Sequence, residues 1–293
     1  MKLAILVPEV DYPTDWSWAY DVEAAALIDA GAGVTPIVWS ETFDATPYDL
    51  VLPLVAWGYH KHFERWMVVL DRLEAQGARV QNPVPLLRWN SDKRYLAQLY
   101  ERGVPVVPTE VAEALDEASL STIGAHFGCS DLVVKPPVSA SAYNTFRIGR
   151  GDSIPDAVGG QRMMMVQPWL NSITETGEWS LLFFDGKLSH TVSKVPVPGE
   201  FRVQPEYGGI ITRCEPPEGA EAVAKAALAA APAAALYARV DLVAGNCGNL
   251  QVIELELIEP ALWLDQAPEA ASCFAEVVLS AARSPIEQPL ADR

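Results

Sequence analysis

ARVDLVAG at residues 238–245 and LQVIELEL at residues 250–257 predict two β-strands joined by a four-residue hairpin loop. Pairing of Gly245 with Leu250 sets the expected register. Polar and apolar residues alternate along the strands, so one face of the hairpin should be polar. That face is expected to carry three carboxylates and one guanidinium, from Arg239, Asp241, Glu254 and Glu256.

The expected register places Asp241 opposite Glu254. Like charges opposed across a sheet destabilise it, and a hard divalent cation with oxygen ligands removes the repulsion. From the hairpin alone two interpretations stay open, a metal site or the solvated face of an amphipathic hairpin. A further acid, Glu259 before Pro260, favours the metal site. The apolar residues of the second strand are expected on the opposite face, namely Ile253, Leu255 and Leu257.

The composition restricts the class of protein. A length of 293 residues suits two compact domains. With 21 Lys and Arg against 38 Asp and Glu, the net charge of −17 disfavours partners such as nucleic acid or an anionic membrane. The four cysteines have no CxxC spacing, which argues against a zinc site. Because we find no signal-peptide pattern and no membrane-spanning apolar run, we expect a soluble cytoplasmic protein.

The order of strand and helix patterns predicts an α/β fold. Apolar runs at residues 2–7, 34–39 and 50–54 alternate with helical patterns, which predicts a parallel sheet at residues 1–90. A connecting helix opening at Ser91 is expected within residues 91–107. Short strand-like runs then predict an antiparallel unit at 108–190. The last unit, 191–293, holds an Ala-rich helix at about 218–236, the hairpin and a tail (284–293) that we expect to fray.

Two lysines are candidates for binding an anion. Lys135 lies in LVVKPP (132–137), an otherwise apolar strand, and a buried ammonium needs an anion such as a phosphate. A lysine that reaches solvent from a strand edge is the simpler interpretation of Lys135 alone. Lys93 alone is compatible with an exposed position in the first turn of a helix. The small-residue run VSASAYNT (138–145) could cradle phosphates through its amides or form a plain turn.

An interrupted strand is a candidate for binding a nucleotide base. Pro168 breaks the apolar run MMMVQPWL (163–170) and leaves neighbouring backbone groups without ladder partners. Such groups could bond the edge of an adenine, or the strand could simply run into a loop. Glu178, shortly afterwards, could take ribose hydroxyls or be exposed.

In this order the motifs resemble the ATP-grasp superfamily, specifically its glutathione-synthetase-like branch. Each motif is weak alone, but their order and spacing over roughly residues 80–280 are specific. The series is N-S-D-K (90–93), V-V-K-P (133–136), the small-residue loop (138–143), Q-P-W-L (167–170), G-E-W-S (177–180), G-E-F-R (199–202) before Gly208-Gly209, R-V-D-L (239–242) and I-E-L-E-L-I-E-P (253–260).

The resemblance implies an N-terminal parallel α/β pre-ATP-grasp domain, followed by a two-part α+β ATP-grasp fold with antiparallel sheets. It implies a ligase that uses ATP and one or two Mg²⁺ ions. Such an enzyme would activate a small-molecule carboxylate or carbonyl group as an acyl-phosphate, join it to an amine, and release ADP and phosphate.

The resemblance also assigns roles to residues. Arg202 would steady the γ-phosphate and the acyl-phosphate, and Arg239 is the second catalytic candidate. ATP would be bound by Lys93, Lys135, Ser139, Ser141, Gln167, Trp169, Leu170 and Glu178, with Trp169 and Leu170 acting through backbone groups. Magnesium would be bound by Asp241, Glu254 and Glu256. The sequence departs from the family pattern at the third metal position, often Asn, and in the loop Ser139-Ala140-Ser141-Ala142, which replaces glycines.

The runs WNSDKRYL (89–96) and VSASAYNT also resemble a smaller group, which contains the ligase that closes the ring of D-cycloserine from an O-ureido-serine. Two rivals stay open: a small-molecule kinase on the same fold, and a non-catalytic nucleotide-binding module. We expect an amino-acid-like substrate and, as the commonest assembly, a homodimer. Substrate contacts are expected from the loops around 11–18, 57–62 and Asn144, although Trp57, Tyr59 and His60 are assigned more readily to core and surface than to substrate.

Overall fold

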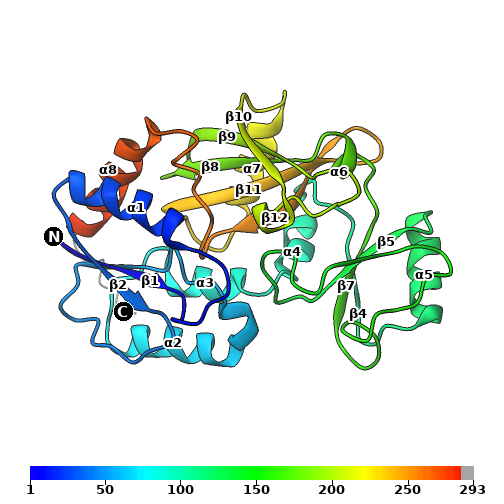
Figure 1. The fold of residues 1–293 in the computed structure, drawn as a ribbon, viewed down its shortest axis with the longest axis horizontal. Helices are drawn as coiled ribbons and strands as arrows, with labels where there is room; N and C mark the ends of the chain where they lie inside the picture. The colour runs from blue at the N-terminus through cyan, green and yellow to red at the C-terminus, as the bar shows by residue number, and fades with distance from the viewer. Residues whose placement is uncertain (285–293) are drawn as a thin grey trace, which may run out of the picture.

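Strand β1 is the centre of a three-stranded parallel sheet, sheet A, in the computed structural model, which describes residues 1–284 (Figure 1). β1 (Lys2–Val7) pairs with β2 (Gly33–Val38) and β3 (Leu50–Leu52). Its apolar run suits a strand covered on both faces. One face packs against helices α1 (Ser17–Asp29) and α8 (Ala270–Arg283), and the other against α2 (Phe63–Ala75) and α3 (Val84–Asn90).

Sheet B is antiparallel and has five strands in the order β10-β9-β8-β11-β12. They are β8 (Glu178–Phe184), β9 (Lys187–Val195), β10 (Ile210–Cys214), β11 (Tyr237–Ala244) and β12 (Leu250–Glu256). Alternate apolar residues of β8, β11 and β12 pack on α4 (Tyr95–Glu101) and α7 (Ala220–Ala229). The opposite face therefore turns its polar residues away from these helices.

Sheet C is a smaller antiparallel sheet at the far end of the molecule from the N-terminus (Figure 1). Its strands are β4 (Glu110–Ala112), β7 (Met164–Pro168), β5 (Leu132–Lys135) and β6 (Phe146–Ile148). Helix α5 (Glu117–Phe127) packs on it. The short elements η1 (Tyr59–His62), α6 (Ser172–Glu175) and η2 (Pro205–Tyr207) connect the larger ones.

The expected α/β architecture is confirmed, with one parallel and two antiparallel sheets. Several limits differ from the expectation. Sheet C ends at Pro168, and β8 and β9 belong to sheet B, so the expected boundary at residue 190 falls inside β9. The connecting helix begins at Tyr95 and not at Ser91. The Ala-rich helix ends at Ala229, shortly before Pro232, which cannot continue a helix.

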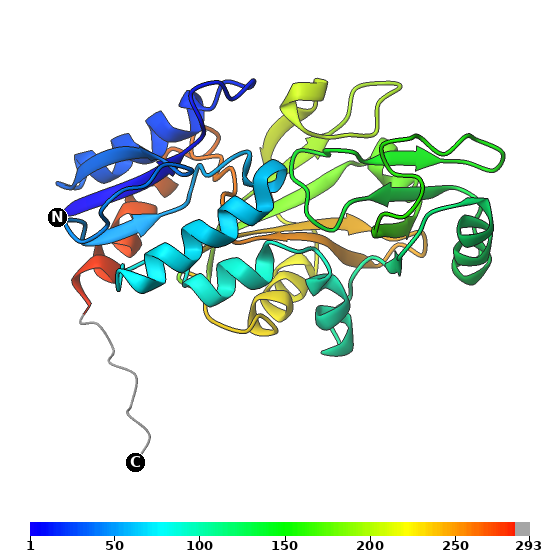
Figure 2. The same cartoon turned by 90° about the horizontal axis from the view of Figure 1, so that it is seen from below.

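The view from below separates the three sheets along the long axis (Figure 2). Helix α8, from the last part of the chain, packs against α1 and β8 and shares a hydrophobic cluster with strands of sheet A. The expected fraying tail lies outside the described residues, apart from Ser284. No helix among residues 1–284 is long and apolar enough to cross a membrane.

Candidate functional site

A cavity of about 440 Å³ is lined by residues of sheets B and C and of the loops that follow β1 and β3. Every residue that the sequence predicted for the site lines this cavity. The volume lies in the range of roughly 300–1,000 Å³ that is typical of small-molecule sites. The fold therefore brings together motifs that are spread over most of the chain.

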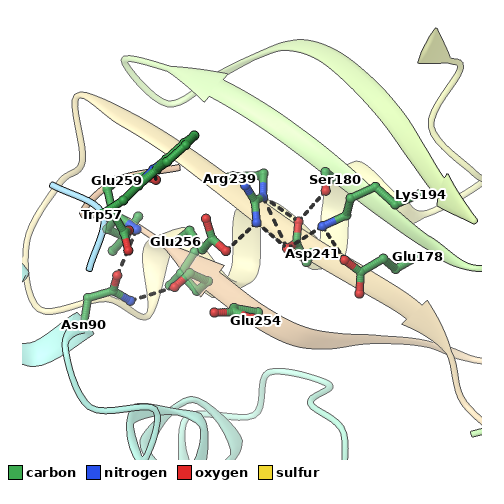
Figure 3. A network of polar contacts seen from close by, with 12 residues as sticks. Trp57, Asn90, Glu178, Ser180, Lys194, Arg239, Asp241, Glu254, Glu256 and Glu259 are labelled. Atoms are coloured by element: carbon green, nitrogen blue, oxygen red, sulfur yellow. Dashed lines mark hydrogen bonds and ion pairs between the residues drawn. The ribbon is translucent and has the colours of Figure 1, made fainter. Parts of the chain in front are cut away.

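The three predicted metal ligands meet on the cavity face of the hairpin (Figure 3). Asp241, Glu254 and Glu256 each offer an oxygen, and these atoms lie within 4.8 Å of one another. Asp241 is paired with Glu254 across β11 and β12, as predicted.

The predicted register near the hairpin loop was wrong, because Leu250 pairs with Ala244 and not with Gly245. A β-bulge after Asp241 adds one residue to β12 and restores the predicted pairs further along. The extra residue is Ile253, which lines the same cavity as Glu254. Ile253 was expected on the opposite face, and the bulge is the reason that it is not.

Basic side chains surround Asp241, which lines the cavity (Figure 3). Arg239 donates to both of its oxygens, with Nε 3.0 Å from Oδ1 and Nη2 3.0 Å from Oδ2. Lys194 Nζ donates to Oδ2 at 3.0 Å, and Ser180 Oγ donates to Oδ1 at 2.5 Å. Lys194 also pairs with Glu178. The carboxylate orientation is thus fixed by the protein itself.

The other two acids have one basic partner each. Glu254 pairs with Lys93, and Glu256 pairs with Arg239. Burial alone would raise the pKa of Asp241, but the charges of Arg239 and Lys194 outweigh it and lower that pKa. Burial also opposes ionisation of Glu254, whose pKa is nevertheless lowered by Lys93 and Lys135. For Glu256 burial dominates and raises the pKa well above its usual range, in spite of Arg239.

Lys135 differs from the other lysines of the cavity. Its side chain is buried, yet it makes no hydrogen bond or ion pair with any residue in the described range 1–284. Burial lowers the pKa of Lys135 to about 8, only partly offset by the charge of Glu254. An ammonium without a partner in a protein cavity is costly unless a ligand supplies an anion.

The predicted adenine-binding segment follows β7. The Gln167 side chain is used internally, because its Nε2 donates to Thr109 Oγ1 at 2.8 Å. The backbone N–H of Trp169 donates to Asp131 O at 2.9 Å, so the expected contact of this amide with adenine is not available. The N–H of Leu170 makes no hydrogen bond within residues 1–284. Leu170 is therefore the amide that remains for a ligand.

The loop without glycines takes the conformation that glycines would favour. Ser141, Ala142 and Asn144 have φ angles of 48°, 53° and 49°, in the left-handed region. Such angles in residues with side chains cost energy and persist where the surroundings require them. The loop is anchored on the body of the protein, because Lys93 N donates to Pro137 O at 2.8 Å. The missing glycines therefore do not prevent a tight turn over the cavity.

Arg202 lies on the loop between β9 and β10 and lines the cavity. Its guanidinium is bound by Glu200, with Nε 2.9 Å from Oε1, and lies 3.7 Å from the centre of the Tyr207 ring. These contacts hold the guanidinium of Arg202 at the cavity, while its side chain stays partly exposed.

Strand β12 is held in place by polar side chains of α3 and α4. Asn90 Nδ2 donates to Leu255 O at 2.7 Å, and Asn90 Oδ1 accepts from Leu257 N at 2.8 Å. The hydroxyl of Tyr95 also donates to Leu255 O, at 2.9 Å. The motif containing Asn90 thus serves the metal-ligand strand as well as carrying Lys93.

Several residues of the cavity were not predicted. Lys194 lines the cavity, and Ser180 binds Asp241. The sequence signal that could have identified Lys194 is its position in a strand-like run before Pro196, comparable to that of Lys135. Trp57, which was assigned more readily to core and surface, lines the cavity. Tyr59 and His60 are buried and do not line it, in keeping with the structural assignment.

The donor set fits a divalent cation. Three carboxylate oxygens within 4.8 Å of one another are hard ligands of the kind that Mg²⁺ prefers. The cluster also lies in a cavity with lysine and arginine side chains, as a site for a metal-bound polyphosphate requires.

Comparison with known proteins supports the same class. A family model described as the N-terminal domain of the D-cycloserine synthetase DcsG matches residues 5–82. The cycloserine biosynthesis protein DcsG of Streptomyces lavendulae is 30% identical over 302 residues, which cover 94% of this chain and 97% of that protein. The crystal structure of D-cycloserine synthetase DcsG superposes with a TM-score of 0.84 at 28% identity, covering 97% of this chain and 100% of the other. D-alanine–D-alanine ligase from Bacillus anthracis, complexed with ATP, has a TM-score of 0.69 at 18% identity, covering 96% and 97%.

Fold and site together define an ATP-grasp ligase. Within that class, the chain belongs to the family of the D-cycloserine synthetase DcsG. The resemblance to the ATP-grasp superfamily and to its D-cycloserine-forming group is therefore confirmed. The similarity to ligases argues against the alternative of a non-catalytic nucleotide-binding module.

Proposed function

We propose that the chain is an ADP-forming ligase that activates a carboxylate or carbonyl group of a small, amino-acid-like molecule as an acyl-phosphate and joins it to an amine. One observation carries this proposal: Lys135 is a buried ammonium without a partner among residues 1–284, in the cavity that also holds three converging carboxylates. A buried ammonium beside a cluster of carboxylates suits a nucleoside triphosphate bound with a metal ion.

Each group then has a role in binding ATP. Lys135 and the amides of the loop at 138–145 bind phosphate oxygens, and the Leu170 N–H bonds the edge of adenine. Lys93 contacts the phosphates in addition to Glu254. Glu178 binds ribose hydroxyls in this proposal, and its buried pairing with Lys194 holds its carboxylate in place.

The acids are proposed to hold Mg²⁺. Asp241, Glu254 and Glu256 supply the oxygen ligands, and bound Mg²⁺ offsets the negative charge of the phosphates. Arg239 keeps Asp241 ionised and oriented. Arg202, held by Glu200, contributes its charge to the γ-phosphate and to the acyl-phosphate after transfer. The amine then displaces phosphate.

The similarity to a D-cycloserine synthetase along nearly the whole chain favours a reaction in which the carboxylate and the amine belong to one molecule. Ring closure is thus our preferred form of the reaction. A cytoplasmic location and a homodimer stay predictions.

The proposal is tested by a screen for products. The enzyme is incubated with ATP, Mg²⁺ and a panel of amino acids and ureido-amino acids, and ADP, phosphate and new amides are measured by chromatography and mass spectrometry. We expect ADP and an amide in equal amounts from at least one substrate. A phosphorylated substrate without an amide would instead support the kinase alternative.

A matched control removes one proposed metal ligand. Glu256→Gln keeps the shape of the side chain, and Arg239 retains Asp241 as its partner. We expect this variant to fold and to lose product formation by about 100-fold or more, because the lost ligand acts on charge that develops during phosphoryl transfer. An unchanged rate would contradict the metal assignment.

A further inference from the structure

One wall of the cavity carries none of the proposed ATP or metal residues. Tyr12, Trp18, Trp57 and Trp263 line it from the loops and elements around sheet A, together with Glu259. The ring centroids of Trp18 and Trp263 lie 5.3 Å apart, and those of Trp18 and Trp57 lie 5.7 Å apart. The three indoles therefore form one continuous aromatic cluster, the aromatic wall.

Glu259 is an acid of the same cavity and lies beside Trp57 of the aromatic wall (Figure 3). Its residue is 8% exposed, and no side chain in residues 1–284 donates a hydrogen bond to its carboxylate or forms an ion pair with it. Its position is fixed through the backbone, since Trp57 Nε1 donates to Glu259 O at 3.2 Å. Asp241, Glu254 and Glu256 differ from it because each is paired with a basic side chain, Glu254 with Lys93 and the other two with Arg239.

The surroundings of Glu259 do not supply the missing cation. Lys93 and Arg239 act on its charge, but each is bound to another acid. Tyr12, from the opposite loop, has its pKa raised to about 12 by burial and then by the charges of Glu259 and Glu206. Negative charge thus gathers at this end of the cavity, and a cationic ligand group would relieve it.

The aromatic wall also favours a cationic ligand group, through cation–π interactions. Tryptophan faces attract cations that lie within about 6 Å of the ring, and the attraction is larger when the cation is removed from water. A carboxylate forms its strongest hydrogen bonds with a charged donor. An anionic or neutral group gains neither interaction.

We propose that Glu259 and the faces of Trp18, Trp57 and Trp263 form the subsite for a positively charged amine of the substrate. This inference rests on the proposed ligase function, and it names the chemical group that the substrate presents at the wall away from ATP. The backbone of Trp263 has a φ of 49°, in the left-handed region that a bulky residue rarely adopts.

The subsite is tested with a probe that does not require the true substrate. Ethylammonium is titrated against the intact protein by saturation-transfer NMR, with n-propanol as the neutral molecule of similar size. We expect saturable binding of ethylammonium and none of n-propanol. Glu259→Gln should weaken ethylammonium binding at least tenfold, whereas Glu101→Gln, the same change at an exposed site on α4, should not.

A second variant keeps the subsite testable if Glu259→Gln does not fold. Trp18→Leu removes one aromatic face at a partly exposed position and should also weaken binding. Equal binding of the two probes to the wild type, or ethylammonium binding that neither variant weakens, overturns the subsite.

Nucleotide binding, measured separately by calorimetry with AMPPNP and Mg²⁺, should be the same in Glu259→Gln and the wild type. A wild type that binds no nucleotide would overturn the proposed function, while the ethylammonium result would still decide the subsite.

Discussion

Nζ of Lys194 lies 3.0 Å from Oδ2 of Asp241, on the polar face of sheet B. Both side chains are buried, and Lys194 also binds Glu178 from the neighbouring strand. The pair joins β9 to β11 across β8, so the acid next to the proposed metal is held by the sheet itself. Groups fixed in this way need little rearrangement when charge develops in a reaction.

Replacing Lys194 by Met should destabilise the protein. The change leaves the buried Glu178 without its basic partner and removes one of two from Asp241. Breaking a buried pair from one side costs about 3–5 kcal/mol, which corresponds to a fall in Tm of about 6 °C or more. Thermal unfolding followed by circular dichroism is the measurement, with the exposed Lys187→Met as control. Equal Tm values for both variants would show that the pair contributes no stability.

Replacing Lys135 by Ala should have the opposite pattern. This ammonium is buried without a partner among residues 1–284, so its loss should leave Tm level or raise it. ATP affinity should fall by about 10- to 100-fold, since hydrogen bonds to charged groups contribute about 1.5–3 kcal/mol. Calorimetry with Mg²⁺ and AMPPNP measures the affinity. Unchanged affinity with a lower Tm would make Lys135 a structural residue.

Nucleotide affinity should also depend on pH through Lys135. Burial lowers the pKa of this lysine to about 8, so in the free protein it is charged below that pH and neutral above it. The affinity for Mg²⁺ and AMPPNP should therefore weaken as the pH rises from 7 to 9.5. Lys135→Gln has no such titration and should show a flatter profile. Parallel profiles for the two proteins would assign the pH dependence to other groups.

Sheet C should move as a lid over the nucleotide. Its strands lie between Glu110 and Pro168, and its small-residue loop lines the cavity. Binding of Mg²⁺ and AMPPNP should slow hydrogen exchange in residues 136–146, because their amides gain phosphate partners. Helix α5, which packs on sheet C, provides the reference segment. If both segments exchange at the same rates with and without nucleotide, the lid is not supported.

The site was predictable where the information is local. Asp241, Glu254 and Glu256 belong to one hairpin, and alternation along two adjacent strands was enough to bring them together. Ile253 was misplaced because a single extra residue in β12 changes the face, and no residue pattern marks that bulge. The role of Lys194 depends on β9 reaching β11 through β8, a pairing that periodicity cannot specify.

The fold was predictable to the same extent. The strand β1 and the helices around it follow from apolar runs and their spacing. The expected limit at residue 190 failed to separate the sheets because β7 and β8 both have the pattern of antiparallel strands. Which sheet a strand joins depends on contacts between distant segments. Helix α8 likewise packs with α1 and shares a hydrophobic cluster with β1, both distant from it in sequence.

The proposed ligase chemistry is tested most directly by identifying the products of a single reaction. The wild-type enzyme is supplied with ATP, Mg²⁺ and the best substrate of the amino-acid and ureido-amino-acid panel, and nucleotide, phosphate and amide are quantified together. The account predicts ADP, phosphate and new amide in a ratio of one to one to one, with no AMP above background. AMP and pyrophosphate as the stoichiometric products, or ADP formed with a stable phosphorylated substrate and no amide, would contradict it.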